Sequence, residues 1–138
     1  MNKQKEISIY IYNKREKSGE YIYVEQMGDQ HFRMTYNAIF NCRLTRGTEF
    51  ITKINAEGHH EVLRITQNSP YLTRRFFYPQ GWKRADLEYL GEELSKLGGH
   101  WQVDFGGIVT VNYPPEAEAT IEHFVKEYDF KVVELVED

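Results

Sequence analysis

The fold of this chain is indicated most clearly by residues 71–136, YLTRRFFYPQGWKRADLEYLGEELSKLGGHWQVDFGGIVTVNYPPEAEATIEHFVKEYDFKVVELV. Their apolar side chains recur first at every second residue and then at the helical spacing of about 3.6 residues. This switching predicts six elements in the order strand, helix, strand, strand, helix, strand. That order is typical of a ferredoxin-like βαββαβ domain. We expect its first strand over Leu72–Tyr78 and its last over Lys131–Val136.

Two helices are expected in this half of the chain. The first should run from about Arg84 to Leu97, because its leucines recur on one side and Gly98 follows as a stop signal. The second should begin at Pro114-Pro115, since proline is favoured in the first turn, and continue to about Tyr128. Their apolar stripes are, in order, Leu87, Leu90, Leu94 and Leu97, and Ala117, Ile121, Phe124 and Tyr128.

A hairpin around Gly106-Gly107 should join the two middle strands. A two-residue turn would mix the two faces of the sheet, because a slip of one residue turns every side chain over. A three-residue loop with a glycine at positive φ instead keeps Trp101 and Val103 on the same face as Val109 and Val111. We therefore predict the three-residue loop.

The first half of the chain shows the alternation of short strands and no helical pattern. Five strands are expected: Ile7–Tyr12, Tyr21–Gln26, His31–Tyr36, Glu49–Ile54 and His60–Thr66. Strands this short, separated by turns, predict a small antiparallel barrel-like sheet. The turn cluster Gln67–Pro70 then divides the chain. We predict an α+β protein with a barrel-like β domain, residues 1–68, and a ferredoxin-like domain, residues 69–138.

Charge is unevenly distributed along the 138 residues. The chain carries 17 basic and 21 acidic side chains, for a net charge of −4, which argues against general binding to nucleic acid or to a membrane surface. Residues 71–84 carry 4 basic and no acidic side chains, whereas residues 85–138 carry 3 basic and 13 acidic ones. A small basic segment thus precedes a strongly acidic one.

The sequence also limits the chemistry that we expect. A single cysteine, Cys42, excludes an internal disulfide and a cysteine-cluster zinc site. His60-Glu61-Val62-Leu63-Arg64 begins like a zinc-protease helix, but Arg64 stands where the second histidine ligand would be. No signal peptide or apolar run of about 20 residues is seen, so we expect a cytoplasmic protein without a metal or cofactor.

One face of the ferredoxin-like sheet is predicted to be polar. With both helices on the other face, it would carry His100, Gln102, Asp104, Thr110 and Asn112. One of the two arginines Arg74 and Arg75 would join them from the first strand. An arginine beside amides could bind an anion or a peptide carboxylate. The alternative is that this face is only solvated, or packs against the first domain.

Residues 71–84 interleave aromatic and basic side chains: Tyr71, Phe76, Phe77, Tyr78 and Trp82 with Arg74, Arg75, Lys83 and Arg84. Proteins that bind single-stranded RNA use such a mixture, because bases stack on rings and cations contact phosphates. Alternation in a strand would, however, send half of these rings into the core, and the surrounding acidic residues oppose a polyanion.

Several short stretches resemble one bacterial family. They are HFRMTYNAIF at 31–40, TRGTEF at 45–50, SPYLTRR at 69–75 and NYPP at 112–115. In these elements the chain, over residues 20–128, resembles the small bacterial proteins of the domain of unknown function 4265. The resemblance implies a two-part bacterial protein without an established activity. If the matching elements mark a site, Asn37, Ser69, Thr73 and Arg74 or Arg75 would line it; turn chemistry is the alternative for Asn37 and Ser69.

From these patterns we predict a non-catalytic binding or regulatory protein that recognises a peptide or a small anionic ligand between its two domains. The main alternative is a protein inhibitor of the immunity type, which would neutralise a basic partner through the acidic surface of residues 85–138. Single-stranded RNA binding through residues 71–84 is the third hypothesis. Homodimerisation through an open sheet edge or face is left open.

Overall fold

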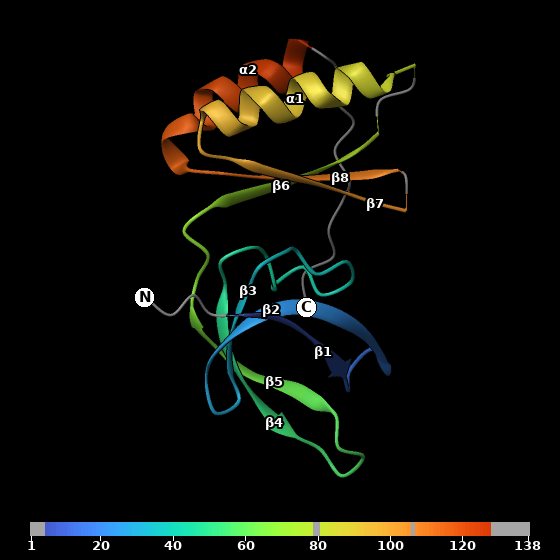
Figure 1. The fold of residues 1–138 in the computed structure, drawn as a ribbon. Coiled ribbons are helices and arrows are strands. Elements are labelled where there is room, and N and C mark those ends of the chain that lie inside the picture. Colours follow the sequence, from blue (N-terminus) through green and yellow to red (C-terminus); the bar gives the residue numbers. More distant parts are fainter. Residues whose placement is uncertain (1–4, 79–80, 106, 128–138) are drawn as a thin grey trace. The chain divides into compact units, whose positions relative to one another are not determined.

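The structure of the protein is a computed structural model that describes residues 5–78, 81–105 and 107–127. It is a mixed α+β fold with a five-stranded sheet, a second small sheet and two helices (Figure 1). The described residues separate into two compact units, with the division between Pro70 and Tyr71. Unit 1 and unit 2, as we call them, are described one at a time.

Unit 1 contains the five strands expected from the sequence. They are β1 Glu6–Asn13, β2 Ser18–Gly28, β3 His31–Met34, β4 Glu49–Ile54 and β5 His60–Gln67. Consecutive strands pair antiparallel, and β1 also meets β5 through one parallel pairing of Ile11 with His60. The alternation of apolar and polar side chains therefore predicted the strands of this half correctly.

The core of unit 1 is formed by alternate residues of these strands. Ile9 of β1 pairs with Ile22 of β2, and both side chains face inward. Because successive side chains in a strand point to opposite faces, the next pair, Tyr10 and Tyr21, faces outward. The buried members of this core are Ile11, Ile22, Val24, Phe32, Met34, Ala38, Leu44 and Phe50.

A long connection between β3 and β4 is attached to the end of this core by Glu20. The carboxylate of Glu20 accepts hydrogen bonds from three successive backbone N–H groups, those of Ile39 at 2.8 Å and of Phe40 and Asn41 at 3.0 Å each. A carboxylate in this position satisfies donors that a turn leaves without backbone partners. Glu20, near the start of β2, thus holds the connection between β3 and β4 in place.

Unit 2 contains the elements β6 Leu72–Phe77, α1 Arg84–Lys96, β7 His100–Asp104, β8 Ile108–Tyr113, the 3-10 turn η1 Pro115–Ala117 and α2 Glu118–Glu127. The strands form an antiparallel sheet in the order β6-β8-β7, and both helices lie on one face of it (Figure 1). The three strands and the two helices were expected from the hydrophobic pattern, whereas residues 115–117, expected as the first turn of the second helix, form the 3-10 turn η1. The expected last strand, residues 131–136, lies outside the described residues.

The hairpin between β7 and β8 has the predicted three-residue loop. Asp104 pairs with Ile108, and this register sets Val103 opposite Val109. The loop has a positive φ of 55° at Phe105, where a glycine was expected to adopt such a conformation, and the Phe105 side chain is 74% exposed. The strand ends at Asp104, so Phe105 belongs to the loop, where its side chain is turned away from the core.

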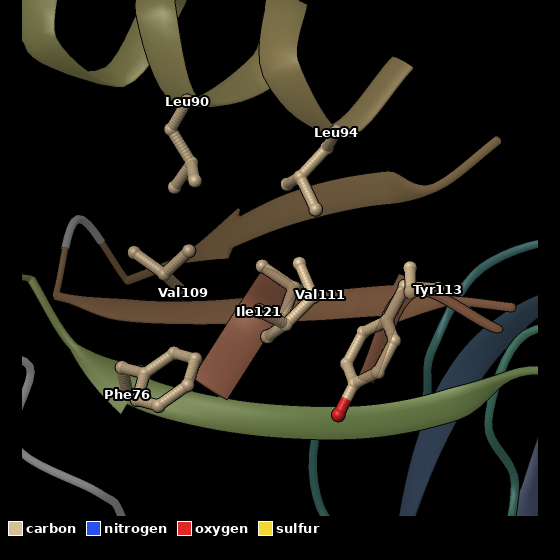
Figure 2. Close-up of a cluster of buried hydrophobic side chains, with 8 residues drawn as sticks. Phe76, Leu90, Leu94, Val109, Val111, Tyr113 and Ile121 are labelled. Carbon is tan, nitrogen blue, oxygen red and sulfur yellow. The ribbon is translucent and has the colours of Figure 1, made fainter. Parts of the chain in front are cut away.

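The core of unit 2 lies between the sheet and the helices. Leu90 and Leu94 descend from α1 toward Val109 and Val111 of β8, with Ile121 of α2 beside them (Figure 2). The other buried members of this core are Phe76, Tyr113 and Ala117. The predicted leucine stripe of α1 and the first residues of the predicted α2 stripe therefore face the core, whereas Tyr128 lies outside the described residues.

Candidate functional site

The register of the second sheet shows which of the two arginines joins the polar face. Arg75 pairs with Thr110, which pairs in turn with Gln102 on β7. Thr73, Asn112 and His100 form the neighbouring row of the same face. Arg75 is thus the arginine that joins the polar face. The sheet brings six of the nine predicted site residues to this one face, where Arg75 and Asn112 are buried: Thr73, Arg75, His100, Gln102, Asp104 and Asn112.

Two hydrogen bonds link neighbouring side chains of this polar face. Asn112 Nδ2 donates to Thr73 Oγ1 at 2.9 Å, and Gln102 Nε2 donates to Asp104 Oδ2 at the same distance. The ring of His100 meets that of Tyr71 edge to face, with 5.5 Å between the centroids. The face therefore holds a hydrogen-bonded polar network, to which Arg75 adds a cationic group.

Arg74 lies on the opposite face of the sheet, so it is the one of the two arginines that does not join the polar face. Its Nε donates to Tyr113 Oη at 2.9 Å, and its Nη2 donates to Glu122 at 2.5 Å and to Glu118. The hydroxyl of Tyr113 donates in turn to Glu118 Oε2 at 2.7 Å. We call these four residues the Arg74 cluster; it connects β6 and β8 to the first two turns of α2.

The Arg74 cluster shifts the pKa of three of its members. Burial, together with the hydrogen bond to Glu118, raises the pKa of Tyr113 to about 12. The hydrogen bond from Tyr113 and the contact with Arg74 lower the pKa of Glu118. Burial opposes the charge of Arg74, but the hydrogen bonds to Glu122, Tyr113 and Glu118 outweigh it and raise its pKa. Each group keeps its ordinary neutral-pH form, as a structural contact requires.

Asn37 and Ser69 lie in unit 1, and both hold the backbone of Arg46. Asn37 Oδ1 accepts the N–H of Arg46 at 2.9 Å, and Ser69 Oγ donates to the carbonyl of Arg46. Gly47 follows with a positive φ of 90° and has Pro70 against it. This is the turn chemistry that was the alternative explanation for these two residues.

The basic and aromatic residues of 71–84 do not form one surface. Phe76 is buried in the core of unit 2, and Tyr78 and Trp82 pack against that core while meeting each other edge to face at 6.3 Å. Phe77 is exposed. The rings that RNA would need for stacking are therefore largely used in packing.

Sequence reasoning missed a groove between α1 and α2, with a volume of about 350 Å³. Its floor is apolar and consists of Leu90, Leu94 and Ile121, with the half-buried Leu97 and Phe124 and the exposed Tyr89 along the sides. The polar residues that line it are Glu93, Lys96, Thr120 and Glu127. The sequence indicates this groove only through the length of the two apolar stripes. Leu97 continues the stripe of α1 and Phe124 that of α2, and both side chains are only half-buried.

The helices that form this groove are acidic. Together α1 and α2 carry seven acidic and three basic residues, and two of the acidic ones are engaged by Arg74. At the groove, Lys96 lies 3.3 Å from Glu93, and His123 lies 3.4 Å from Glu127 one turn earlier on α2. The two helices thus carry an excess of acidic side chains, and the groove itself is lined by two acidic residues and one basic residue.

The histidine segment that resembled a zinc-protease motif is strand β5, as its alternation suggested. Thr52 Oγ1 and His60 Nδ1 lie 2.8 Å apart, and the His60 ring packs edge to face on Phe32; burial lowers the pKa of His60. Within the described ranges, no three histidine, cysteine or acidic side chains gather as metal ligands. Nor does that part of the chain contain a helix long and apolar enough to cross a membrane.

Comparison with known proteins supports the fold and leaves the function open. No family model matches the chain, and no curated protein does. A crystal structure of a hypothetical protein from Neisseria gonorrhoeae is similar, with a TM-score of 0.62 and 16% identity over 97% of this chain and 95% of that one. At this identity the likeness concerns the fold alone. The resemblance to the domain of unknown function 4265 therefore stays a prediction.

Proposed function

We propose that this is a non-catalytic binding protein whose unit 2 holds a basic, amphipathic helical segment of a partner protein in the groove between α1 and α2. The observation that carries the proposal is the apolar groove of about 350 Å³ with acidic side chains around it. It joins the two leading hypotheses from the sequence, peptide recognition and neutralisation of a basic partner through an acidic surface.

The floor of the groove suits apolar anchors. Peptide-binding grooves of this kind receive one face of a helix, whose anchors recur every three to four residues. Leu94 and Ile121 provide an aliphatic surface for an apolar anchor. Tyr89, which is 49% exposed, provides an aromatic ring at the side of the groove that the anchor can contact. An exposed tyrosine beside an apolar floor is a frequent feature of protein-binding surfaces.

The surrounding charge selects the partner. Glu93 and Glu127 lie at the groove, and Glu92 lies on the exposed side of α1. Opposite charges speed association and exclude partners of the wrong sign more than they add to affinity. A partner segment with lysines or arginines beside its apolar face therefore fits the groove better than a neutral one. An inhibitor of a basic protein would use the same surface.

The test is binding of a fluorescein-labelled amphipathic helix of lysine and leucine, followed by fluorescence anisotropy, against a peptide of the same composition in scrambled order. We expect Tyr89→Ala to weaken binding at least about fivefold and Glu93→Gln roughly twofold to fivefold. Glu92→Gln is the matched control, because it removes the same charge from the neighbouring residue, and Glu92 does not line the groove. Equal losses in Glu92→Gln and Glu93→Gln, or equal binding of the scrambled peptide, would reject the groove.

A small anionic ligand on the polar face of the second sheet is the other candidate function. The observation that favours it is the Thr110 hydroxyl, which is buried in β8 without a hydrogen-bond partner in the described part of the chain and pairs in register with Arg75 and Gln102. A melting screen with phosphate, sulfate and carboxylates tests it. Stabilisation by an anion should be lost in Arg75→Gln and kept in Glu92→Gln.

The finer fold assignment belongs with these proposals. Pairing of β1 with β5 at Ile11 supports a barrel-like unit 1. In unit 2 the order β6-β8-β7 is that of the first three strands of a ferredoxin-like sheet, whose last strand would add beside β6. We place the protein in a bacterial cytosol, where it would act without a cofactor.

A further inference from the structure

The outer side of β1 and β2 in unit 1 carries a row of tyrosines. Tyr10 pairs with Tyr21 and Ser8 pairs with Tyr23, while the alternate pairs, such as Ile9 with Ile22, face the core. Tyr21 is 72% exposed and Tyr23 is 49% exposed. Exposed aromatic groups that gather on one face mark an interaction surface more often than single ones do.

The rings of this row touch one another and those of neighbouring segments. Tyr10 contacts Tyr21 with 5.1 Å between the ring centroids and His59 with 4.9 Å, and Tyr12 lies 6.2 Å from His59. Tyr23 contacts Tyr36, which is 46% exposed, at 5.4 Å. We call the six residues the tyrosine surface: Tyr10, Tyr12, Tyr21, Tyr23, Tyr36 and His59.

The backbone is adapted to this surface at Gly19. A Cβ atom at that position would lie 2.2 Å from the hydroxyl oxygen of Tyr10 and 2.3 Å from its ring. Because glycine has no side chain, the Tyr10 ring can pack against the backbone of β2 at Gly19, near the turn that joins the two strands. The ring stays at the surface instead of pointing straight out.

The turn beside this end of the tyrosine surface is basic. Lys14, Arg15 and Lys17 are exposed there, against a single acidic residue, Glu16. Asn13 Oδ1 accepts the backbone N–H groups of Arg15 at 3.0 Å and of Glu16 at 3.1 Å, so the turn is ordered. The backbone that carries these cations is thus held in a turn directly after the Tyr12 end of β1.

Acidic side chains near the other end are engaged. Glu25 follows Tyr23 on the same face of β2, and its Oε2 lies 2.7 Å from Nη2 of Arg33. Glu6 accepts a hydrogen bond from the Thr35 hydroxyl at 2.6 Å. Glu57, in the turn that carries His59, is exposed and is the acidic residue that a polyanion would have to avoid. The tyrosine surface is therefore bordered by an excess of positive charge at its Tyr12 end.

We propose that the tyrosine surface binds single-stranded nucleic acid. Bases would stack on the exposed rings of Tyr21 and Tyr23, and the phosphates would run toward Lys14, Arg15 and Lys17. Tyr21 and Tyr23, two residues apart on one strand, are separated by about 7 Å, which suits two successive unstacked bases. Stacking on rings with flanking cations tolerates any base sequence, because every base has a π face.

This site is separate from the groove of the proposed function, and it does not use residues 71–84. Binding of a sugar by one ring would not account for six aromatic groups in a row with three cations at one end. A second copy of this chain would meet its own cations there, which disfavours self-association through this face. Nucleic acid is the partner that complements both the rings and the charge.

The test uses the full-length protein and fluorescein-labelled 12-residue oligo(U) and oligo(dT), followed by anisotropy at several salt concentrations. We expect Tyr21→Ala to weaken binding about tenfold and Tyr21→Trp to preserve it. Phe105→Ala is the matched control, since Phe105, at 74% exposed, is as accessible as Tyr21 but lies after β7 in unit 2 and does not line the groove. Lys17→Gln should flatten the salt slope by about 0.7, whereas Lys53→Gln, at an exposed lysine of β4, should leave it unchanged.

Three results would overturn the proposal. One is the absence of oligonucleotide binding at low salt by a protein that melts cooperatively. Another is binding that Tyr21→Ala and Phe105→Ala weaken equally. The third is a dimer or a glycan complex that Tyr21→Ala abolishes while oligonucleotide binding is missing. The peptide assay is independent of all three, because none of its variants touches the tyrosine surface.

Discussion

The hydroxyl of Tyr113, the last residue of β8, donates a hydrogen bond to Oε2 of Glu118, the first residue of α2, across 2.7 Å. Between these two residues the chain passes through Pro114 and the 3-10 turn η1. Arg74 of β6 bonds to both side chains and so attaches the start of α2 to the sheet. Because α2 forms one side of the apolar groove, this contact positions the surface that we propose for the partner.

Loss of the Tyr113 hydroxyl should destabilise unit 2 and change its response to alkali. Tyr113 is 1% exposed, and Tyr113→Phe removes two hydrogen bonds, one to Glu118 and one from Arg74, each worth about 1 kcal/mol, while the ring still fills the core. Since the folded state raises the pKa of Tyr113 from 10.0 to about 12, wild-type stability should fall as pH rises through this window. Urea unfolding at several pH values measures both effects.

Tyr89→Phe is the control for this experiment, because Tyr89 is an exposed tyrosine of the same unit. It should leave stability unchanged and should keep the alkaline loss of the wild type. If Tyr113→Phe loses stability between pH 10 and 12 as steeply as the wild type does, the Tyr113 hydroxyl is not the group responsible.

The carboxylate of Glu118 should contribute stability that acid removes. The hydrogen bond from Tyr113 and the contact with Arg74 lower the pKa of Glu118, so its contribution is present above the ordinary value of 4.5 and is lost as pH falls through the lowered folded-state value. We expect Glu118→Gln to be less stable than the wild type at neutral pH by about 1 kcal/mol or less, because the side chain is 41% exposed. The two proteins should converge in acid; a constant difference from neutral pH to pH 2 would contradict the assignment.

Glu20→Gln should loosen the connection between β3 and β4. The amide keeps one acceptor but turns a donor toward the N–H groups of residues 39–41, so we expect a loss of about 1–3 kcal/mol in the free energy of unfolding. Hydrogen exchange should show faster exchange at these three amides in particular. Glu16→Gln, in the exposed β1–β2 turn, is the matched control and should change neither quantity.

Gly91→Ala should destabilise the protein even though alanine favours helix. A Cβ atom at residue 91 would lie 2.2 Å from Nε1 of Trp101, so the indole must move away from α1. In the Trp101→Ala background this conflict is absent, and the same change should stabilise α1 by up to about 1 kcal/mol. A double-mutant cycle in urea measures the coupling. A stabilising Gly91→Ala in the presence of Trp101 would show that the ring gives way without cost.

The order of elements in unit 2 and the strands of unit 1 could be predicted because they depend on local periodicity. The length of the β7–β8 loop could be predicted as well, since the one-residue slip of the alternative would have mixed the faces. Arg74 could not be separated from Arg75 in this way. Both alternations of β6 end in a phenylalanine, Phe76 or Phe77, so the pattern allowed either face to be apolar.

The candidate sites required contacts between distant segments. The groove exists because α1 and α2 pack side by side at a distance that no helical stripe specifies, and it is lined by residues from both. The Arg74 cluster joins residues 39 to 48 positions apart along the chain. Side-chain pairings at such separations depend on the register of three strands and the position of a helix.

The class of the fold, the positions of the strands and helices, and the acidic character of unit 2 can all be predicted from the residues alone, because periodicity and charge are local properties of the chain. Contacts between distant segments, in contrast, determine which arginine faces the polar side, where an apolar groove opens, and that Tyr10 and Tyr12 of β1 meet His59 from the β4–β5 turn. These relations arise only when strands pair and helices pack, since a side chain acquires its neighbours from segments that the local pattern does not contain.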